Sequence, residues 1–388
     1  SLSVAHRGRG VFLRSRFSCS AWAALLGCSL RHRRRLLQRR ALQGIEDFSV
    51  FRSAEGEEFE LFADKVLGAG AQGTVYVGKS RMSGQKVAIK AIPTWRLVLD
   101  ECGSEKLTAI DEEFATLRRL GSHPNIASMI TAVDLYQPGA ASSFPHYKFI
   151  VMEVVEGCEL AEHIAVEGPL LESVARHVFL QVLDGLTHVH SCGIIHRDLK
   201  PENVLITGNQ VSLDSQVKLI DFGVAKCIRS GPLQTVVGTP SFMAPEMAKA
   251  KIGYSPNLSS RRQVFTWGQQ PAAPAAVGQA VEDHNVLLEL KPERQFCPKI
   301  DVWSAGVVLY TCLTGKIPFK SELEIIESDY LREPLGHCSE EAKELLAGML
   351  EKEPDRRLSI DECALHPWIA CSEDDACTID PTNMLGFA

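Results

Sequence analysis

The first part of the chain alternates apolar and polar residues in short runs that glycines interrupt. Examples are "FELFADKVLGAGAQGTVYVGKS", from Phe59 onward, and "GQKVAIKAI" after it. Alternation with a period of two residues, broken by glycine, is typical of β-strands joined by turns. The apolar stretch "YKFIVMEVVEG" at 147–157 predicts a further, buried strand that ends at Gly157.

The pattern then becomes helical. In "IDEEFATLRRL" at 110–120, Ile110, Phe114 and Leu117 recur at the spacing of one helix face. Segments beyond Gly157, such as "LESVARHVFLQVLDGLTHVHSCG", have the same texture. A strand-rich part followed by a helix-rich part predicts an α+β chain of two lobes, joined near residues 153–157.

Composition is that of an ordinary globular protein, with 388 residues, 45% of them hydrophobic and 23% charged. The twelve cysteines include no C-x-x-C pair, so neither a zinc ribbon nor a redox motif is indicated. This usage favours reduced, intracellular thiols. No apolar run approaches the roughly 20 residues of a membrane span, and we expect no transmembrane segment.

Charge is distributed unevenly. Ten arginines and no acidic residue precede Glu46. Without these ten, 31 Lys and Arg remain against 48 Asp and Glu, which gives the rest of the chain a charge of −17. A body this acidic disfavours binding of nucleic acid through a broad basic face, so we expect no nucleic-acid partner.

Residues 1–45 are set apart as an Arg-rich tail, for which several readings stay open. Its Arg- and Ser-containing, acid-free composition is typical of an organelle transit peptide. The stretch "SAWAALLGCSL" also fits a short signal segment, and "RHRRRLLQRR" fits a nuclear or membrane-surface patch. A disordered tail without a specific role is the remaining reading. We expect a cytoplasmic protein, or an organellar one if the tail is a transit peptide.

Candidate chemistry begins with the glycine-rich "LGAGAQGTV", in which Gly68, Gly70 and Gly73 give G-x-G-x-x-G. Glycines let the backbone approach a phosphate and direct N–H groups at it. A strand rather than a helix follows, which argues against the dinucleotide-binding fingerprint. The next strand carries Lys90 of "VAIK" on the same face as Ala88, where the lysine needs an anionic partner.

The stretch "IIHRDLKPENVLI" at 194–206 places a His, an Arg, an Asp, a Lys and an Asn between apolar pairs, which is costly unless they have partners or a function. With the glycine-rich loop, "VAIK", "DFG" at 221–223 and "APE" in order, the sequence resembles the protein kinases over residues 60–370. The resemblance implies a two-lobed kinase fold, with a small β-rich N-lobe at 60–152 and a larger helical C-lobe at 157–370.

The resemblance also implies ATP and Mg²⁺ as cofactors and assigns roles to single residues. Asp198 of "HRDLKPEN" is the expected catalytic base that orients the substrate hydroxyl, and Lys200 neutralises charge on the transferred phosphoryl group. Asn203 and Asp221 are the expected Mg²⁺ ligands. Phosphoryl transfer asks mainly for positioning and charge neutralisation, which explains this mixture of cations and carboxylates.

Lys90 then requires a glutamate from the helix that follows it, and two adjacent candidates exist. At about 100° per residue, Glu113 shares the inward stripe with Ile110 and Leu117, whereas Glu112 points away from it. We therefore expect Glu113 to be the partner, with Glu112 as the alternative.

An adenine ring needs an apolar slot and backbone hydrogen bonds. The resemblance assigns the nucleotide site, including the glycine-rich loop and the hinge at 153–155, to Leu67, Gly68, Gly70, Gly73, Val75, Ala88, Lys90, Met152, Glu153, Val155 and Leu205. For the apolar members simple core packing is the alternative reading.

The predicted substrates are serine and threonine hydroxyls of proteins. "HRDLKPEN" is similar to the loop of Ser/Thr kinases, and Thr239 of "GTPSFMAPE" matches the residue that bonds the base and Lys200 in those enzymes. Glu159 and Glu202 match positions that hold an arginine upstream of the phosphoacceptor, with a solvated surface role as the alternative. An acidic body suits basic substrates.

Several features bear on control. "LEKEPDRRLSIDECALHPWI" resembles the closing helices of the calcium/calmodulin-dependent kinase group, in which Arg357 would pair with Glu246 and Asp301 would anchor the catalytic loop. The tail at 371–388 is short and acidic, whereas a calmodulin target is a basic amphipathic helix, so calmodulin binding is not supported. The resemblance implies that Thr235 is the activating phosphosite, with Ser230 as a weaker rival and an unmodified surface threonine as the alternative. We expect a monomer.

The sequence departs from the family mainly in an insert at about 252–296. Its Pro-, Ala- and Gln-rich part indicates a linker. A neutral loop, a regulatory or partner-binding element, and an error in the sequence assignment are the readings left open. Two rival functions are a pseudokinase that acts as a scaffold and a small-molecule phosphotransferase. The catalytic residues disfavour the first, and the peptide-docking residues disfavour the second.

Overall fold

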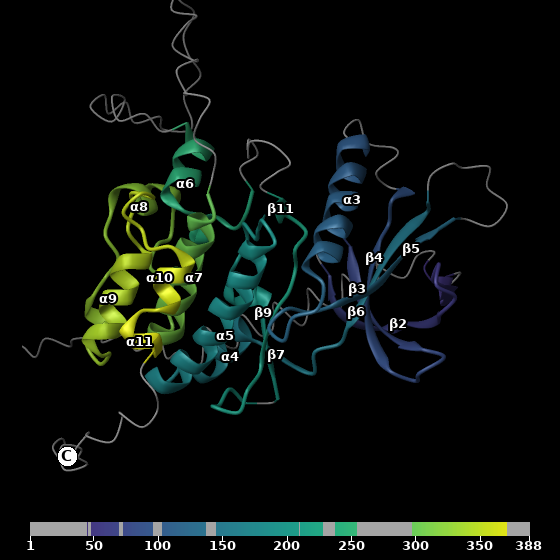
Figure 1. The fold of residues 1–388 in the computed structure, drawn as a ribbon, viewed down its shortest axis with the longest axis horizontal. Helices are drawn as coiled ribbons and strands as arrows, with labels where there is room; N and C mark the ends of the chain where they lie inside the picture. The colour runs from purple at the N-terminus through teal and green to yellow at the C-terminus, as the bar shows by residue number, and fades with distance from the viewer. Residues whose placement is uncertain are drawn as a thin grey trace, which may run out of the picture.

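The computed structural model describes residues 45, 48–69, 73–95, 103–136, 145–208, 210–227, 237–253 and 297–370. They form a small lobe built on a β-sheet and a larger, mostly helical lobe (Figure 1). The chain passes between them from β6 (Tyr147–Glu153) to β7 (Gly157–Glu159). The junction is where the change of pattern predicted it, and the α+β architecture is confirmed.

Six strands in antiparallel pairs make the sheet of the small lobe, in the order β1-β2-β3-β4-β6-β5. The bounds of the other five are Val50–Arg52 (β1), Glu58–Ala69 (β2), Thr74–Ser80 (β3), Lys86–Ile92 (β4) and Met129–Leu135 (β5). Alternation sorts the side chains of β6 between two cores, Phe149 and Val151 on one face and Ile150 on the other. Each face of the sheet therefore has its own apolar cover.

The outer face is covered partly by residues that precede the expected start of the N-lobe. Ile45, Phe48 and Phe51 are buried there, and the ring of Phe51 meets that of Phe149 edge-on at 4.9 Å. The boundary placed at residue 60 falls inside β2 and leaves β1 out. The reason is that these three apolar residues recur every third position, which gives no strand signal.

The opposite face of the sheet is covered by α3 (Gly103–Leu120), which lies between the sheet and the larger lobe (Figure 1). Ile110 and Leu117 of α3 are buried in a core that continues into the larger lobe. The inward stripe predicted from the sequence is thus present. It sets the direction in which the remaining side chains of α3 point.

The larger lobe is organised around α7 (Lys299–Thr314), whose residues from Ile300 to Leu313 are all buried. A helix that is apolar all round has to lie inside other helices. α7 packs against α5 (Glu172–Ser191), α9 (Glu340–Met349) and the 3₁₀ turns η4 (Pro240–Phe242) and η5 (Glu333–Leu335). The lobe also contains α4 (Leu160–Glu167), α6 (Pro245–Ile252), α8 (Glu322–Glu327), α10 (Ile360–Ala364), α11 (Pro367–Ala370) and the turn η2 (Pro201–Asn203).

Two small antiparallel sheets lie between α5 and the small lobe. One has the order β10-β9-β7, with β9 at Val204–Thr207 and β10 at Val217–Leu219, and the other pairs β8 (Ile194–Ile195) with β11 (Lys226–Cys227). β8 precedes and β9 follows the segment "HRDLKPEN", so this segment is held at both ends. Nearly all of the expected insert at about 252–296, and the tail at 371–388, lie outside the described residues. Within the described ranges no helix is both long and apolar enough to cross a membrane.

Candidate active site

A buried carboxylate fixes the loop that follows β8. Asp301 of α7 accepts hydrogen bonds from the backbone N–H groups of His196 and Arg197, each at 2.8 Å, and from Nε2 of His190 at 2.8 Å. Burial raises the pKa of Asp301, but the His190 hydrogen bond and the neighbouring charges outweigh it and hold the pKa below its ordinary value. Arg197 has φ of 67°, a left-handed conformation that the two backbone hydrogen bonds, from the N–H groups of His196 and Arg197 to Asp301, stabilise.

Asp198 lies at the centre of a compact hydrogen-bonded group. Its Oδ2 is 2.7 Å from Nζ of Lys200, and its Oδ1 accepts from the backbone N–H and the hydroxyl of Thr239 at 2.7 and 2.8 Å. Lys200 also donates to Oγ1 of Thr239 at 2.9 Å. The carboxylate, the ammonium and the hydroxyl predicted from the sequence are therefore brought together.

Lys90 of β4 pairs with Glu113 of α3, at 2.6 Å between Nζ and Oε1, so the inward-facing glutamate is the partner and Glu112 is not. Burial raises the pKa of Glu113, and the positive charge of Lys90 opposes this shift. Nζ of Lys90 also lies 3.7 Å from Oδ1 of Asp221, which has φ of 62°. The ammonium thus stands between a carboxylate of each lobe.

Asn203 and Asp221, the predicted Mg²⁺ ligands, are linked through the backbone. The N–H of Ile220 donates to the backbone oxygen of Asn203 at 3.0 Å, and Nδ2 of Asn203 donates to the backbone oxygen of Asp198 at 2.8 Å. The second bond leaves the side-chain oxygen of Asn203 to act as a ligand. One amide oxygen and one carboxylate fit a hard cation that takes its other ligands from phosphate and water. The described residues contain no cluster of three or more His, Cys, Asp or Glu suited to a metal.

The predicted nucleotide residues that the structure describes come from strands of both lobes and from the segment that joins them. Val75 stands opposite Lys90 in the sheet, and Ala88 stands opposite Met152. A Cβ at Gly73 would lie 2.4 Å from the backbone oxygen of Ala91, so only glycine allows β3 to begin so close to β4. Leu67 and Gly68 are on β2 and Leu205 is on β9. Gly70 lies outside the described residues.

The hinge at Glu153–Val155 is held through the first of these residues. The carboxylate of Glu153 accepts from the N–H of Ser128 and from Nζ of Lys218, both at 2.7 Å. The N–H of Glu153 donates to the backbone oxygen of Ser128 at 3.0 Å. This segment is anchored from both lobes.

The predicted substrate residues come from neighbouring elements of the larger lobe. Glu159 on β7 stands opposite Leu205 on β9, and Glu202 is exposed on η2. Thr239 belongs to the Asp198 group described above. The two glutamates thus lie on segments adjacent to the catalytic loop, and their role in substrate recognition stays a prediction.

Thr235 lies outside the described residues, but the cation expected to receive its phosphate is described. Nε of Arg197 donates to the backbone oxygen of Val224 at 2.6 Å, while its buried Nη1 has no hydrogen-bond partner among the described residues. Burial lowers the pKa of Arg197. A buried guanidinium with an unsatisfied donor is ready to receive an anion.

One further contact supports the segment beyond Thr239. Arg357 forms a bidentate ion pair with Glu246, with two N–O distances of 2.9 Å, as the sequence predicted.

His190, which bonds Asp301, was not singled out from the sequence. Only its place in the last turn of the helix before "HRDLKPEN" indicated it.

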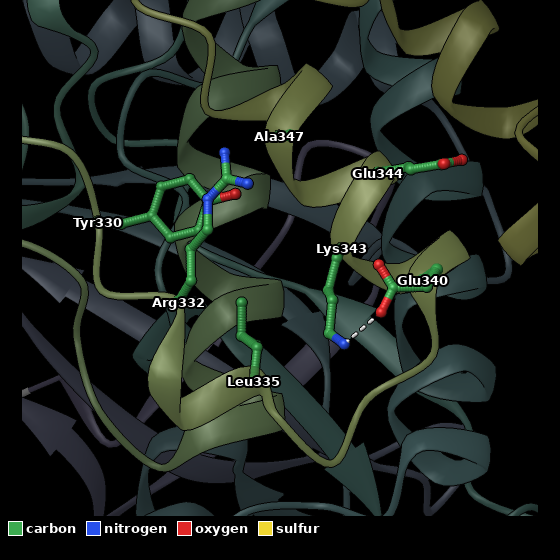
Figure 2. A pocket seen from close by; sticks show the side chains of 7 residues that line it. All are labelled: Tyr330, Arg332, Leu335, Glu340, Lys343, Glu344 and Ala347. Carbon is green, nitrogen blue, oxygen red and sulfur yellow. Dashed lines mark hydrogen bonds and ion pairs between the residues drawn. The ribbon is translucent and has the colours of Figure 1, made fainter.

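A separate cavity of about 150 Å³ lies on the larger lobe and contains none of these residues (Figure 2). It is bounded by α9 and the segment before it, with Tyr330 and Arg332 close together on one side and the Lys343–Glu340 ion pair on another. Four of the seven residues that line it are charged, and we assign it no role.

The sequence matches the family model described as "Protein kinase domain" at residues 62–267 and 286–369, so residues 268–285, within the expected insert, are unmatched. The chain is 29% identical over 335 residues to a probable myosin light chain kinase of Dictyostelium discoideum, covering 84% of this chain and 87% of that protein. It is 32% identical over 312 residues to human calcium/calmodulin-dependent protein kinase type 1B, covering 78% and 73%. It is 32% identical over 314 residues to calcium-dependent protein kinase 4 of Arabidopsis thaliana, covering 79% of this chain but only 51% of that protein.

Proposed function

Because the chain belongs to the protein kinase family, alongside Ser/Thr kinases of the calcium- and calmodulin-dependent group, we propose that it transfers the γ-phosphoryl group of ATP to Ser and Thr hydroxyls of proteins. A kinase domain uses ATP and protein substrates, and the fold is the two-lobed kinase fold. The proposal adds that this chain is active, depends on Mg²⁺, and prefers basic residues upstream of the phosphoacceptor.

The single observation that carries the proposal is the Asp198–Lys200–Thr239 group. Asp198 presents a carboxylate that Lys200 and Thr239 hold in one orientation. As the proposed catalytic base, Asp198 receives the proton of the substrate hydroxyl and aligns the hydroxyl oxygen for attack on the γ-phosphoryl group. Lys200 lies within 2.7 Å of the base and places a positive charge where the transferred group gains negative charge.

The small lobe contributes Lys90, whose ammonium binds phosphate oxygens while Glu113 fixes its position. Its 3.7 Å approach to Asp221 places this cation next to the predicted metal ligands. Asn203 and Asp221 would hold Mg²⁺, which neutralises phosphate charge when it is bound. Tight positioning by two lobes is what phosphoryl transfer asks of a protein.

Upstream basic residues are proposed as the substrate preference because Glu159 and Glu202 lie beside the catalytic loop and the body of the chain is acidic. The calcium dependence in the relatives' names belongs to those proteins. The tail at 371–388 contains no basic amphipathic stretch, and calmodulin control is not part of the proposal.

A pseudokinase scaffold is the second candidate, since an intact fold alone binds partners. The joint presence of Lys90, Asp198, Asn203 and Asp221 in bonded positions favours the active enzyme.

The test is incubation of the full chain with labelled ATP, Mg²⁺ and a positional peptide library, with EDTA and Asp198→Asn as controls. Label on Ser- and Thr-containing peptides that both controls abolish supports the proposal. Nucleotide binding without transfer to any peptide, by the phosphorylated and the dephosphorylated chain alike, supports the scaffold instead.

A further inference from the structure

One lysine of the small lobe is placed where its strand is otherwise apolar. Lys148 is the second residue of β6, and it is only 8% exposed. Alternation along β6 turns it away from the outer aromatic cluster of Tyr147 and Phe149, to the face that α3 covers. A buried ammonium is costly unless carboxylates surround it.

Two carboxylates surround it, and they come from different elements. Asp134 of β5 stands directly opposite Lys148 in the register of the sheet, with Oδ1 at 3.1 Å from Nζ. Asp111 of α3 lies closer, with Oδ1 at 2.7 Å. The ring centroid of Phe114, one turn along α3, is 5.2 Å from the same ammonium. Asp134 holds the ammonium within the sheet, and Asp111 joins it to the helix.

The position of Asp111 on α3 complements that of Glu113. Counted from Ile110 at about 100° per residue, Phe114 lies near 40°, Asp111 near 100° and Glu113 near 300°. The two carboxylates therefore flank the buried stripe on its two sides. Each is bonded to a lysine of the sheet, Asp111 to Lys148 on β6 and Glu113 to Lys90 on β4.

Apolar contacts are not directional, so an apolar stripe alone defines the rotation of a helix less sharply than ion pairs do. Ion pairs on both flanks limit the rotation of α3, since turning it either way lengthens one of them. Rolling α3 so that Asp111 leaves Lys148 also changes the distance from Glu113 to Lys90.

We propose that Lys148 is a positioning residue which, through Asp111, sets the rotation of α3 and so keeps Glu113 on Lys90. The effect on catalysis rests on the proposed function, whereas the effect on α3 does not. Lys148 touches no reacting atom. Burial opposes the charge on Lys148, but the hydrogen bonds that it donates to the two carboxylates raise its pKa, so the ammonium stays charged at neutral pH.

Asp111→Asn and Asp134→Asn form a matched pair of variants. Each replaces one carboxylate beside Lys148 by an amide of the same shape, but only Asp111 belongs to α3. Lys148→Met keeps the length of the side chain without its charge, and Lys148→Arg keeps the charge. Lys343→Met, which breaks an exposed ion pair on α9, controls for loss of an unrelated lysine.

The first readout is amide hydrogen exchange of α3 in the purified full chain, which needs no turnover. We expect Lys148→Met and Asp111→Asn to speed exchange in α3 about threefold to tenfold, as loss of a partly exposed ion pair does, with α7 unchanged. Asp134→Asn and Lys343→Met should stay within about twofold of wild type, and Lys148→Arg should restore most of the protection.

The second readout is kcat/KM for ATP with a peptide substrate. It should fall by a similar factor in Lys148→Met and Asp111→Asn, while KM for the peptide stays within about twofold. A wild-type chain without transferase activity overturns the proposed function and leaves the exchange data to decide the role of Lys148. Equal effects of Asp111→Asn and Asp134→Asn, or unchanged exchange in α3, overturn the positioning role.

Discussion

Arg357 and Glu246 meet in a bidentate ion pair across 111 positions of sequence, with Arg357 only 1% exposed. The guanidinium also donates to the backbone oxygen of Lys299 at 2.9 Å and lies 5.2 Å from the ring centroid of Trp303. One side chain thus joins the first turn of α6, the start of α7 and the segment after α9.

Glu246→Gln should destabilise the larger lobe, because it leaves a buried guanidinium without its counter-charge. We expect a loss of about 2–4 kcal/mol in the free energy of unfolding, measured by chemical denaturation. Glu340→Gln removes the partner of an exposed lysine and should cost less than about 0.5 kcal/mol. Similar losses of unfolding free energy in Glu246→Gln and Glu340→Gln would mean that the buried ion pair stabilises the fold no more than an exposed one.

Asp198→Asn should leave nucleotide binding within about twofold of wild type but lower kcat by roughly 10²- to 10⁴-fold. The amide no longer takes up a proton, and orienting the hydroxyl acts in the transition state rather than on bound substrate. Single-turnover phosphorylation and nucleotide titration separate the two effects. Glu344→Gln, on α9, is the control. A single-turnover rate close to wild type would remove Asp198 from its proposed role.

Replacing Glu159 and Glu202 together by Gln should weaken the preference for arginine upstream of the phosphoacceptor. Exposed charges of this kind contribute about 1 kcal/mol or less each, so we expect a roughly fivefold to twentyfold loss of selectivity for the pair. A positional peptide scan measures it. Unchanged arginine selectivity would assign both glutamates to the solvated surface.

Thr235→Ala should lower peptide turnover and leave the nearby segment open to proteolysis. A phosphate on Thr235 brings about −1.5 to −2 charges, and Arg197 next to the base has a buried Nη1 without a partner among the described residues. Phosphatase-treated and phosphorylated wild type provide the comparison. Full activity of Thr235→Ala, with the protease resistance of the phosphorylated chain, would exclude Thr235 as the switch.

Glu172 gives a prediction for pH. Burial raises its pKa, but hydrogen bonds from Ser339 and Trp368 outweigh this, so the folded-state pKa lies below the ordinary 4.5. The ionised carboxylate of Glu172 therefore stabilises the folded state fully above pH 4.5, and this stabilisation disappears as the pH falls through the folded-state pKa. Glu172→Gln should cost about 1–2 kcal/mol in the free energy of unfolding at neutral pH, and the difference from wild type should shrink as the pH falls below 4.5 toward the folded-state pKa. A difference in the free energy of unfolding between wild type and Glu172→Gln that stays the same at every pH would contradict this prediction.

Local periodicity on α3 was enough to select Glu113 over Glu112, because the two candidates differ by one position on a regular helix. The grouping of Asp198, Lys200 and Thr239 was expected from the resemblance to the protein kinases and not from spacing alone. Packing between distant segments was harder. The outer cover from Ile45 to Phe51 and the link from Lys148 to Asp111 depend on which faces the register brings together. For the link from Lys148 to Asp111, the signal available in the sequence was a lysine within an otherwise apolar strand.

The anchoring of the catalytic loop by Asp301 also has a consequence for synthesis of the chain. The N–H groups of His196 and Arg197 find their acceptor on a residue 105 and 104 positions later. The entropic cost of closing a loop grows only slowly with its length, so the long separation in sequence is not itself an obstacle. The contact cannot form, however, before α7 leaves the ribosome. A nascent chain that ends before α7 therefore contains Asp198 but cannot hold its loop through Asp301. The loop reaches its final geometry only once the larger lobe is nearly complete.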